Sequence, residues 1–325
     1  MAADIMSRMS ESPENNRTSV QVIEIKEDQH GQRLDNFLAR VLAGVPKSMI
    51  YRIIRKGQVR VNKGRIKPMH RLKTGDFVRI PPVRLETESE QKSLPDTLLA
   101  DVGKRILFEN DKCMVIDKPS GLAVHGGSGL RFGLLDVVRA IRQHENFLEL
   151  VHRLDRETSG CLMLAKNRQT LVFMHEQLKQ GQMTKKYLAG VDGKWPTGKK
   201  TVSAPLKKNT MQGGERLVEV HEEGKEAVSH FKLVQHYKRL SLVEVDLQTG
   251  RTHQIRVHAA HEGHPVAGDK KYGNKDSNKW FKEKGLNRLF LHAYWLEFYL
   301  PGESDRTQVN TPLPEELQAV LNELE

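Results

Sequence analysis

The chain has 325 residues, enough for one large domain and one small one, and its 52 Lys and Arg against 41 Asp and Glu give a formal net charge of +11. A chain this basic is typical of proteins that bind a polyanion, although a basic surface that only aids solubility is the alternative. Cys113 and Cys161 lack the spacing of a zinc site or a disulfide framework, and no stretch reaches the roughly 18 apolar residues of a membrane helix. We therefore expect a cytoplasmic protein with no membrane or metal partner.

The first quarter of the chain is predicted to form a tail followed by a small domain. Residues 1–19 are polar, have no apolar core of the signal-peptide kind and are predicted to be disordered. A small domain is predicted over 20–83. Apolar residues recur at helical spacing from Leu34 to Leu42, and a second helix over 49–57 closes at Gly57. Two short strands around an Asn62-Lys63-Gly64 turn and a last strand before Pro81 complete it.

The small domain concentrates positive charge. Between Arg33 and Arg79 it has thirteen lysines and arginines against two aspartates. One face of the second helix and the turn after it carry five of these cations: Arg52, Arg55, Lys56, Lys63 and Arg65. Phosphate backbones are the natural partner of such a surface, and a merely solvated charged face is the alternative. The whole segment, including the G-x-V-x-V-N stretch, resembles an S4 domain, which implies RNA binding.

A linker and a large domain are predicted after the small one. Residues 84–103 are polar and acidic and contain a proline, so we predict a flexible linker. From 104 to 325, most candidate strands follow one another through turns and not through regular crossover helices. This order favours an α+β domain built on a largely antiparallel sheet.

One acidic residue in the large domain is a candidate catalytic group. In LVHRLDRETSGCLMLAK, residues 150–166, Asp155 stands between Arg153 and Arg156 with apolar residues on both sides. A carboxylate that cations keep ionised, at the junction of a strand and a turn, can act as a nucleophile or a base. A structural ion pair explains this segment equally well.

A second stretch, residues 247–273, predicts a strand that turns at Gly250 into a helix. Arg251, His253 and Arg256 cluster near the start of that helix. Four histidines in this stretch could suggest a metal site, but no acid or cysteine accompanies them at ligand spacing, so packing and RNA contact are favoured. Tyr187 begins a strand, where an isolated tyrosine is more often a core residue.

Together these stretches resemble the RluA family of pseudouridine synthases. The family's H-R-L-D-x-x-T-S/T-G motif is matched by residues 152–155 and 158–160, and further blocks are DKPSGLAVHGG, KKYLA, TGRTHQIRVH and NRLFLHA. The resemblance implies an S4 domain followed by an α+β synthase domain. It also implies an enzyme that isomerises uridines in 23S, large-subunit ribosomal RNA without a cofactor. A synthase acting on other ribosomal or transfer RNA uridines, and a non-catalytic S4-type assembly factor, are the alternatives.

The resemblance also implies a role for each site residue. Asp155 attacks the nucleotide or removes a ribose proton, Tyr187 packs on the uracil and helps remove the C5 proton, and Arg256 pairs with Asp155. Arg153 fills the gap left by the flipped nucleotide, and Leu291 lines the pocket. Arg251, His253 and the cations of the small domain hold the RNA backbone. The expected partner is large-subunit RNA or the assembling subunit, and a monomer is expected.

Overall fold

A computed structural model describes residues 19–42, 45, 47–83, 94–126, 132–210 and 216–325. The chain divides into two compact units, Met1–Ser93 and Leu94–Glu325. Up to residue 18, the tail predicted to be disordered lies outside the described residues, as does the first half of the predicted linker, 84–93. Within the described ranges, no helix is both long and apolar enough to cross a membrane.

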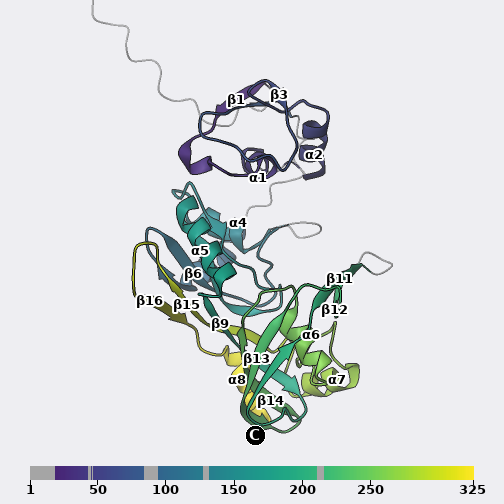
Figure 1. Cartoon of the computed structure of the whole chain (residues 1–325). Coiled ribbons are helices and arrows are strands. Elements are labelled where there is room, and N and C mark those ends of the chain that lie inside the picture. Colours follow the sequence, from purple (N-terminus) through teal and green to yellow (C-terminus); the bar gives the residue numbers. More distant parts are fainter. Residues whose placement is uncertain (1–18, 43–44, 46, 84–93, 127–131, 211–215) are drawn as a thin grey trace, which may run out of the picture. The chain divides into compact units, whose positions relative to one another are not determined.

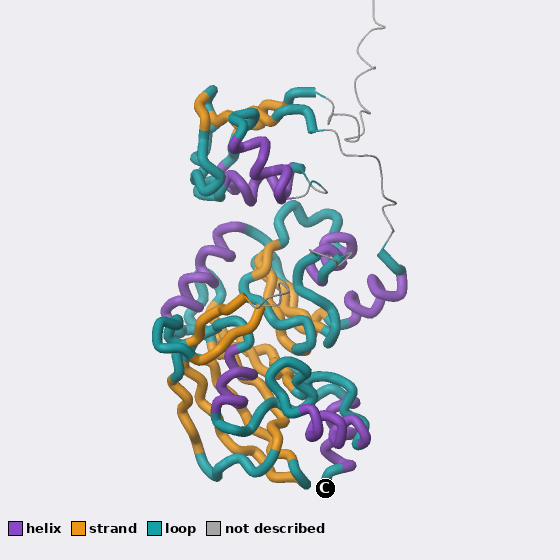
Figure 2. The backbone as a smooth tube through the Cα atoms, turned by 90° about the vertical axis from the view of Figure 1, so that its right-hand side faces the viewer, coloured by secondary structure: helices purple, strands orange, loops and turns teal. Residues whose placement is uncertain are grey.

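The small unit packs helices on one side of a four-stranded antiparallel sheet (Figure 2). Its elements are β1 (Gln21–Glu24), the 3-10 helix η2 (Glu27–Gln29), α1 (Leu34–Val41), α2 (Lys47–Arg55), β2 (Arg60–Val61), β3 (Gly64–Arg65) and β4 (Phe77–Ile80), with strand order β1-β4-β2-β3. Asn62 and Lys63 have positive φ angles of 48° and 66° and form the turn between β2 and β3, whereas Gly64, predicted as part of the turn, is the first residue of β3. Leu34, Ile50 and Ile54 are buried in one core, so the helical spacing predicted from the sequence is confirmed.

The linker prediction is wrong for its second half. Residues Asp96–Lys104 form helix α3, which packs against α4 (Leu134–Ile141). Val102 is fully buried, and Leu98 and Leu99 pack against the main core of the large unit. Burial of these three side chains stabilises an ordered helix, so the large unit begins ahead of residue 104.

The large unit is built on a ten-stranded, mostly antiparallel sheet (Figure 1). Its central order is β10-β13-β14-β9-β15-β8-β6-β5, with β16 on β15 and β7 on β8. The strands are β5 (Ile106–Glu109), β6 (Cys113–Lys118), β7 (Glu149–Leu150), β8 (Ser159–Ala165), β9 (Thr184–Asp192), β10 (Lys199–Ser203), β13 (Val228–Tyr237), β14 (Leu240–Leu247), β15 (Leu291–Tyr299) and β16 (Arg306–Asn310). Strands β11 (Leu206–Thr210) and β12 (Arg216–Val220) form a separate hairpin. The predicted α+β class is confirmed.

Helices cover the sheet, and alternate residues of its central strands enter different cores. In β6, Met114 and Ile116 belong to one buried cluster, whereas Cys113 and Val115 belong to another that contains Met174 of α5 (Arg168–Gln180). This is the period of two expected for a strand buried on both faces. The remaining helices are α6 (Gln254–His261), α7 (Lys275–Glu283) and α8 (Glu315–Glu323), and Phe281 of α7 and Leu317 of α8 pack in one core with Leu240 of β14.

A close contact between their backbones aligns strands β8 and β15. β8 and β15 form a short parallel pair in which Gly160 lies opposite Ala293. Gly160 has a φ of +110°, and a Cβ atom there would lie 2.2 Å from the Ala293 carbonyl oxygen. Only glycine fits, so β8 and β15 can start side by side. The loop before β8 and the first residue of β15 therefore bring Asp155 and Leu291 toward one cavity.

Candidate active site

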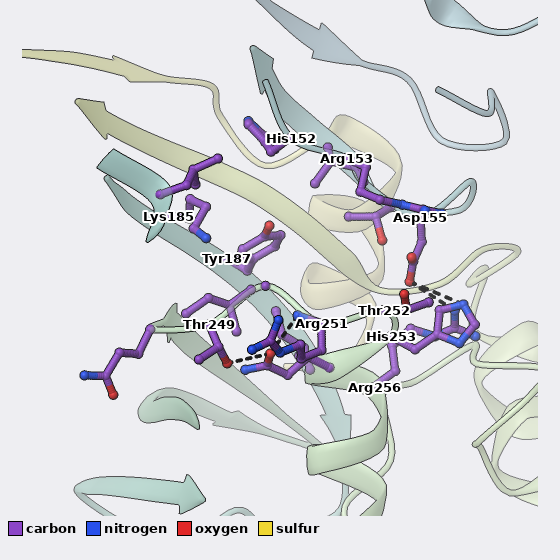
Figure 3. A pocket seen from close by; sticks show the side chains of 18 of the residues that line it. His152, Arg153, Asp155, Lys185, Tyr187, Thr249, Arg251, Thr252, His253 and Arg256 are labelled. Carbon is purple, nitrogen blue, oxygen red and sulfur yellow. Dashed lines mark hydrogen bonds and ion pairs between the residues drawn. The ribbon is translucent and has the colours of Figure 1, made fainter. Parts of the chain in front are cut away.

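Several segments of the large unit surround a cavity of about 560 Å³ (Figure 3). The loop before β8 contributes His152 to Asp155, β9 contributes Lys185 and Tyr187, residues 247–256 form a further wall, and α5 and Leu291 complete the lining. The volume lies within the roughly 300–1,000 Å³ typical of small-ligand sites, which is room for one nucleotide. Asp155 is the only acidic side chain among the described residues that line it.

The loop that carries Asp155 is anchored by a buried lysine. Lys118, at the end of β6, is fully buried, and its ammonium group donates to the carbonyl oxygens of Pro119 (2.9 Å), Leu122 (2.8 Å) and Arg156 (3.0 Å). Burial, followed by the charge of Arg288, lowers the pKa of Lys118 to about 7. The three hydrogen bonds fasten residues 119–122 to the residue after Asp155, so they limit movement of that carboxylate.

Asp155 pairs with Arg256, and not with the two arginines that flank it in sequence. Arg256 Nη1 donates to Asp155 Oδ2 at 3.2 Å. Arg156 turns away and donates to the Gly121 carbonyl oxygen at 2.8 Å. The pair between Asp155 and Arg256 that the family resemblance implied is therefore present. The idea that the sequence neighbours of Asp155 supply its counter-charge is wrong, because Arg156 is committed to the backbone of another loop.

A second carboxylate holds Arg256. Asp269 is almost fully buried and receives two hydrogen bonds from Arg256, from Nε to Oδ2 at 2.7 Å and from Nη2 to Oδ1 at 2.9 Å. Burial alone would raise the pKa of Asp269, but these bonds, the charge of Arg256 and the amides of Lys271 and Tyr272 outweigh it, so that pKa is lowered. Burial would lower the pKa of Arg256, but the two carboxylates raise it instead. Arg256 is therefore a fixed cation.

The turn before α6 positions His253 and Arg256. Buried Gln254 accepts hydrogen bonds from Thr249 Oγ1 (2.8 Å) and from the Arg251 amide (2.9 Å), and donates to the Val228 carbonyl oxygen (2.9 Å). His253 adopts a left-handed conformation with φ of 56°, and its Nε2 lies 3.9 Å from Asp155 Oδ2. Burial lowers the pKa of His253 below its ordinary value, although the charge of Asp155 opposes this. A local hydrogen-bond network therefore sets where α6 begins.

Tyr187 and Leu291 form the apolar part of the pocket. Tyr187 is 7% exposed and belongs to the main core while its side chain borders the cavity (Figure 3). Burial, and then the charge of Asp155, raises the pKa of Tyr187, so the phenol stays protonated at neutral pH. Leu291, the first residue of β15, is 4% exposed and lies in the wall of the cavity.

Cations surround the rest of the cavity. Arg153 is exposed at the cavity, and Arg251 donates from Nε to the Glu226 carbonyl oxygen at 3.0 Å. Lys185, two residues before Tyr187 on β9, also lines the cavity, and burial lowers its pKa. Such an arrangement suits a ligand that carries phosphates.

The histidines after His253 have separate surroundings. His258 is fully buried between Ser229 Oγ and the Ala204 carbonyl oxygen, and His264 Nδ1 donates to the Asp192 carbonyl oxygen at 2.8 Å. All three contacts hold these histidines within the fold, which is the packing role favoured from the sequence. Across the described ranges, no three side chains of histidine, cysteine, aspartate or glutamate are grouped as metal ligands would be.

The five predicted RNA-contact residues of the small unit are solvent-exposed. They are Arg52, Arg55, Lys56, Lys63 and Arg65. On α2 the opposite side is apolar, with Ile50, Ile53 and Ile54 buried. The exposed cationic face expected for α2 is therefore present.

Comparison with known proteins identifies the class. The RNA pseudouridylate synthase family model matches residues 112–261, and the S4 domain model matches residues 32–78. The chain therefore belongs to the RluA family of pseudouridine synthases, in the branch with an N-terminal S4 domain.

Similar proteins narrow the position within the family. Ribosomal large subunit pseudouridine synthase C of Haemophilus influenzae is 50% identical over 94% of this chain and 96% of its own length. The protein of that name from Escherichia coli K12 is 51% identical over 94% of this chain and 97% of its own length. The solved structure of human RNA pseudouridylate synthase domain containing 4 is 25% identical, with a TM-score of 0.57 over 70% of this chain and 96% of its own.

Sequence reasoning missed three residues that shape the site. They are Lys118, which lies in DKPSGLAVHGG, and Gln254 and Asp269, which lie within residues 247–273. The sequence alone predicted no role for any of them. A general signal was available for two of them: a lysine and a glutamine in largely apolar strands or helix starts must find hydrogen-bond partners when buried. Asp269 had no comparable signal, because its partner is thirteen residues away across a loop.

Proposed function

We propose that this protein isomerises specific uridines of 23S, large-subunit ribosomal RNA to pseudouridine, with Asp155 as the group that reacts with the nucleotide. The observation that carries the proposal is the Asp155–Arg256 pair beside Tyr187, in a nucleotide-sized cavity that cations surround. The half-identical large-subunit pseudouridine synthases, matched over nearly their full length, support the choice of RNA.

The reaction needs no change of oxidation state. Asp155 begins it by attacking C1′ of the nucleotide or by removing a ribose proton, and in either route the bond between N1 and C1′ breaks. The uracil then rotates on Tyr187 and C5 bonds to C1′; the same step expels the Asp155 carboxylate from C1′ in the first route and returns the ribose proton from Asp155 to the sugar in the second. C5 loses its proton and N1 ends with one, so product and substrate have the same atoms. Arg256 remains beside Asp155 throughout as a cation, because it is paired with both Asp155 and Asp269.

The target base must leave its stack before this chemistry starts. C1′ and C5 are inaccessible in a stacked helix, so the nucleotide is flipped into the cavity. Arg153, exposed at the cavity, fills the space that the nucleotide leaves. Arg251, His253 and the exposed cations of the small unit hold phosphates, which position the RNA. The protein acts as a monomer in the cytoplasm, on large-subunit RNA or on the assembling subunit.

Experiments distinguish the proposed function from two alternatives, a synthase that acts on other RNA and a non-catalytic assembly factor. Mapping pseudouridines by carbodiimide-dependent reverse-transcription stops, in cells with and without the gene, identifies the targets. Loss of stops in 23S RNA supports the proposal, whereas loss confined to other ribosomal or transfer RNA redirects it to a related substrate. An S4-type assembly factor would leave every stop in place. For that case, Asp155→Ala is the matched control, because an enzyme loses turnover and keeps RNA affinity, while a binder has no turnover in either form.

A further inference from the structure

The guanidinium group of Arg256 is divided unequally between two carboxylates. Two of its N–H groups, on Nε and Nη2, form a fork on Asp269, and one, on Nη1, reaches Asp155. Arginine prefers this two-bond fork whenever a carboxylate offers both oxygens. Because Asp269 takes the fork, Asp155 receives a single bond at 3.2 Å.

The position of Asp269 is itself fixed from several sides. Its Oδ1 accepts the amides of Lys271 (2.9 Å) and Tyr272 (3.1 Å), and its carbonyl oxygen accepts Asn278 Nδ2 at 2.8 Å. The guanidinium group lies over the ring of Tyr272, with Arg256 Cζ 5.1 Å from the ring centroid. The Asp269 side chain is inaccessible to water, so solvent cannot replace it as the partner of Arg256.

We infer that Asp269 is a positioning residue that keeps Asp155 reactive, because it occupies the fork of Arg256 and leaves one Asp155 oxygen free to react. This inference rests on the function proposed above. Attack on C1′ and removal of a ribose proton both consume a lone pair of Asp155. Among the described residues, the hydrogen bond and both ion pairs of Asp155 involve Oδ2, and none involves Oδ1. A fork on Asp155 itself would engage both oxygens and oppose either reaction.

Asp269→Asn tests this inference because it keeps the size of the side chain and removes its charge. Arg256 is then free to pair more fully with Asp155. At saturating RNA, we expect the single-turnover rate to fall by about 10- to 100-fold. This is the scale of loss seen when the hydrogen-bond partner of a metal-binding side chain is removed from other enzymes. RNA affinity should stay unchanged, since Asp269 is buried away from solvent.

The pH dependence of the rate separates positioning from a structural role. In Asp269→Asn, Arg256 stabilises the ionised Asp155 more strongly, so the acidic limb of the rate profile should move to lower pH. In the matched variant Arg256→Met, which removes the cation, the same limb should move to higher pH. The other ionisable groups that interact with the charge of Asp155 are retained in both variants: Lys118, Tyr187, His253 and Tyr272.

Several results would overturn the inference. One is a wild-type rate and pH profile in Asp269→Asn. Another is an acidic limb of Asp269→Asn that moves to higher pH, as expected for Arg256→Met. An equal additional loss when Asp269→Asn is made in the Arg256→Met background would show that Asp269 does not act through Arg256. These results require an active wild type and an inactive Asp155→Asn. Inactivity of the wild type itself would instead contradict the proposed function.

If Asp269→Asn does not fold, Asn278→Ala provides the test. It removes the hydrogen bond to the Asp269 carbonyl oxygen and the one accepted from the Gly268 amide, and it leaves every charge in place. We expect a lower rate at unchanged RNA affinity, with a downward shift of the acidic limb that is smaller than for the charge-removing variant. A wild-type rate in a variant with a lowered melting temperature would mean that the placement of Asp269 matters for stability alone.

Discussion

Replacing Arg256 by methionine removes the cation from between two carboxylates, one of which cannot reach water. The Arg256 side chain is 11% exposed and that of Asp269 is 0% exposed. Removing one partner of a buried ion pair destabilises a protein by about 3–5 kcal/mol. Because Asp269 keeps its hydrogen bonds from the amides of Lys271 and Tyr272, we expect the lower end, about 3 kcal/mol of unfolding free energy.

The loss should depend on pH in a defined direction. In the native protein the pKa of Asp269 is lowered, so its contribution to stability is present above the unfolded value of 3.8 and is lost as the pH falls through the folded pKa. In Arg256→Met, burial without a cation raises the folded pKa of Asp269 above the unfolded one. The variant therefore gains stability as the pH falls, and the gap between the two proteins should narrow from pH 8 to pH 5.

Urea unfolding followed by tryptophan fluorescence measures this effect in the whole chain. All three tryptophans, Trp195, Trp280 and Trp295, lie in the large unit, so the signal reports the unit that holds Asp269. The same protein with Arg156→Met is the matched control, because that arginine is exposed. Equal stability of Arg256→Met and wild type, or a gap that is the same at both pH values, would refute the argument.

Three further outcomes are expected. Asp155→Asn should make no detectable pseudouridine while RNA binding, measured by filter retention, persists; substantial turnover would remove Asp155 as the reacting group. A fragment of residues 94–325 should fold and bind RNA more weakly, with a log–log salt slope shallower by about 0.7–0.9 for each lost phosphate contact. Its single-turnover activity should return at high enzyme concentration, and a folded, RNA-saturated but inactive fragment would mean that the small unit helps to shape the active site. Cys113 and Cys161 are buried with pKa values that burial raises to about 12, so neither should react with iodoacetamide at pH 8 until urea is added; rapid native labelling, read by mass spectrometry, would contradict this.

The small unit could be predicted almost completely because its signals are local. Gly57, with a φ of +67°, lies two residues after the end of α2, and Asn62 is of a residue type that favours the positive φ angle of the turn it begins. Helix α3 could not be predicted in this way. Its apolar residues Leu98, Leu99 and Val102 follow an acidic, proline-containing run, and their helical spacing has meaning only once the core they pack against is known.

The same distinction holds for the active site: the residues in sequence motifs could be predicted, whereas the contacts between distant residues could not. Asp155, Tyr187 and Leu291 lie in motifs that can be read from the sequence, and they border one cavity. The partner of Asp155 could not be read from its neighbours, because Arg153 and Arg156 are adjacent in sequence whereas Arg256 is adjacent in space. Asp269 shows the limit most clearly, since its role depends on the direction of individual N–H bonds, which no residue spacing specifies.

The hydroxyl of Tyr272 is the hydrogen-bond partner of Nδ1 of His253. That oxygen accepts the Val218 amide at 3.0 Å and lies 2.7 Å from His253 Nδ1. In the tautomer in which the phenol donates to Nδ1, the one ring proton of the neutral imidazole is on Nε2, the nitrogen that lies 3.9 Å from Asp155 Oδ2. The imidazole then turns the positive end of its dipole toward that carboxylate without adding a second formal charge, and the phenol that stabilises this tautomer is itself held by a backbone amide of the β11–β12 hairpin.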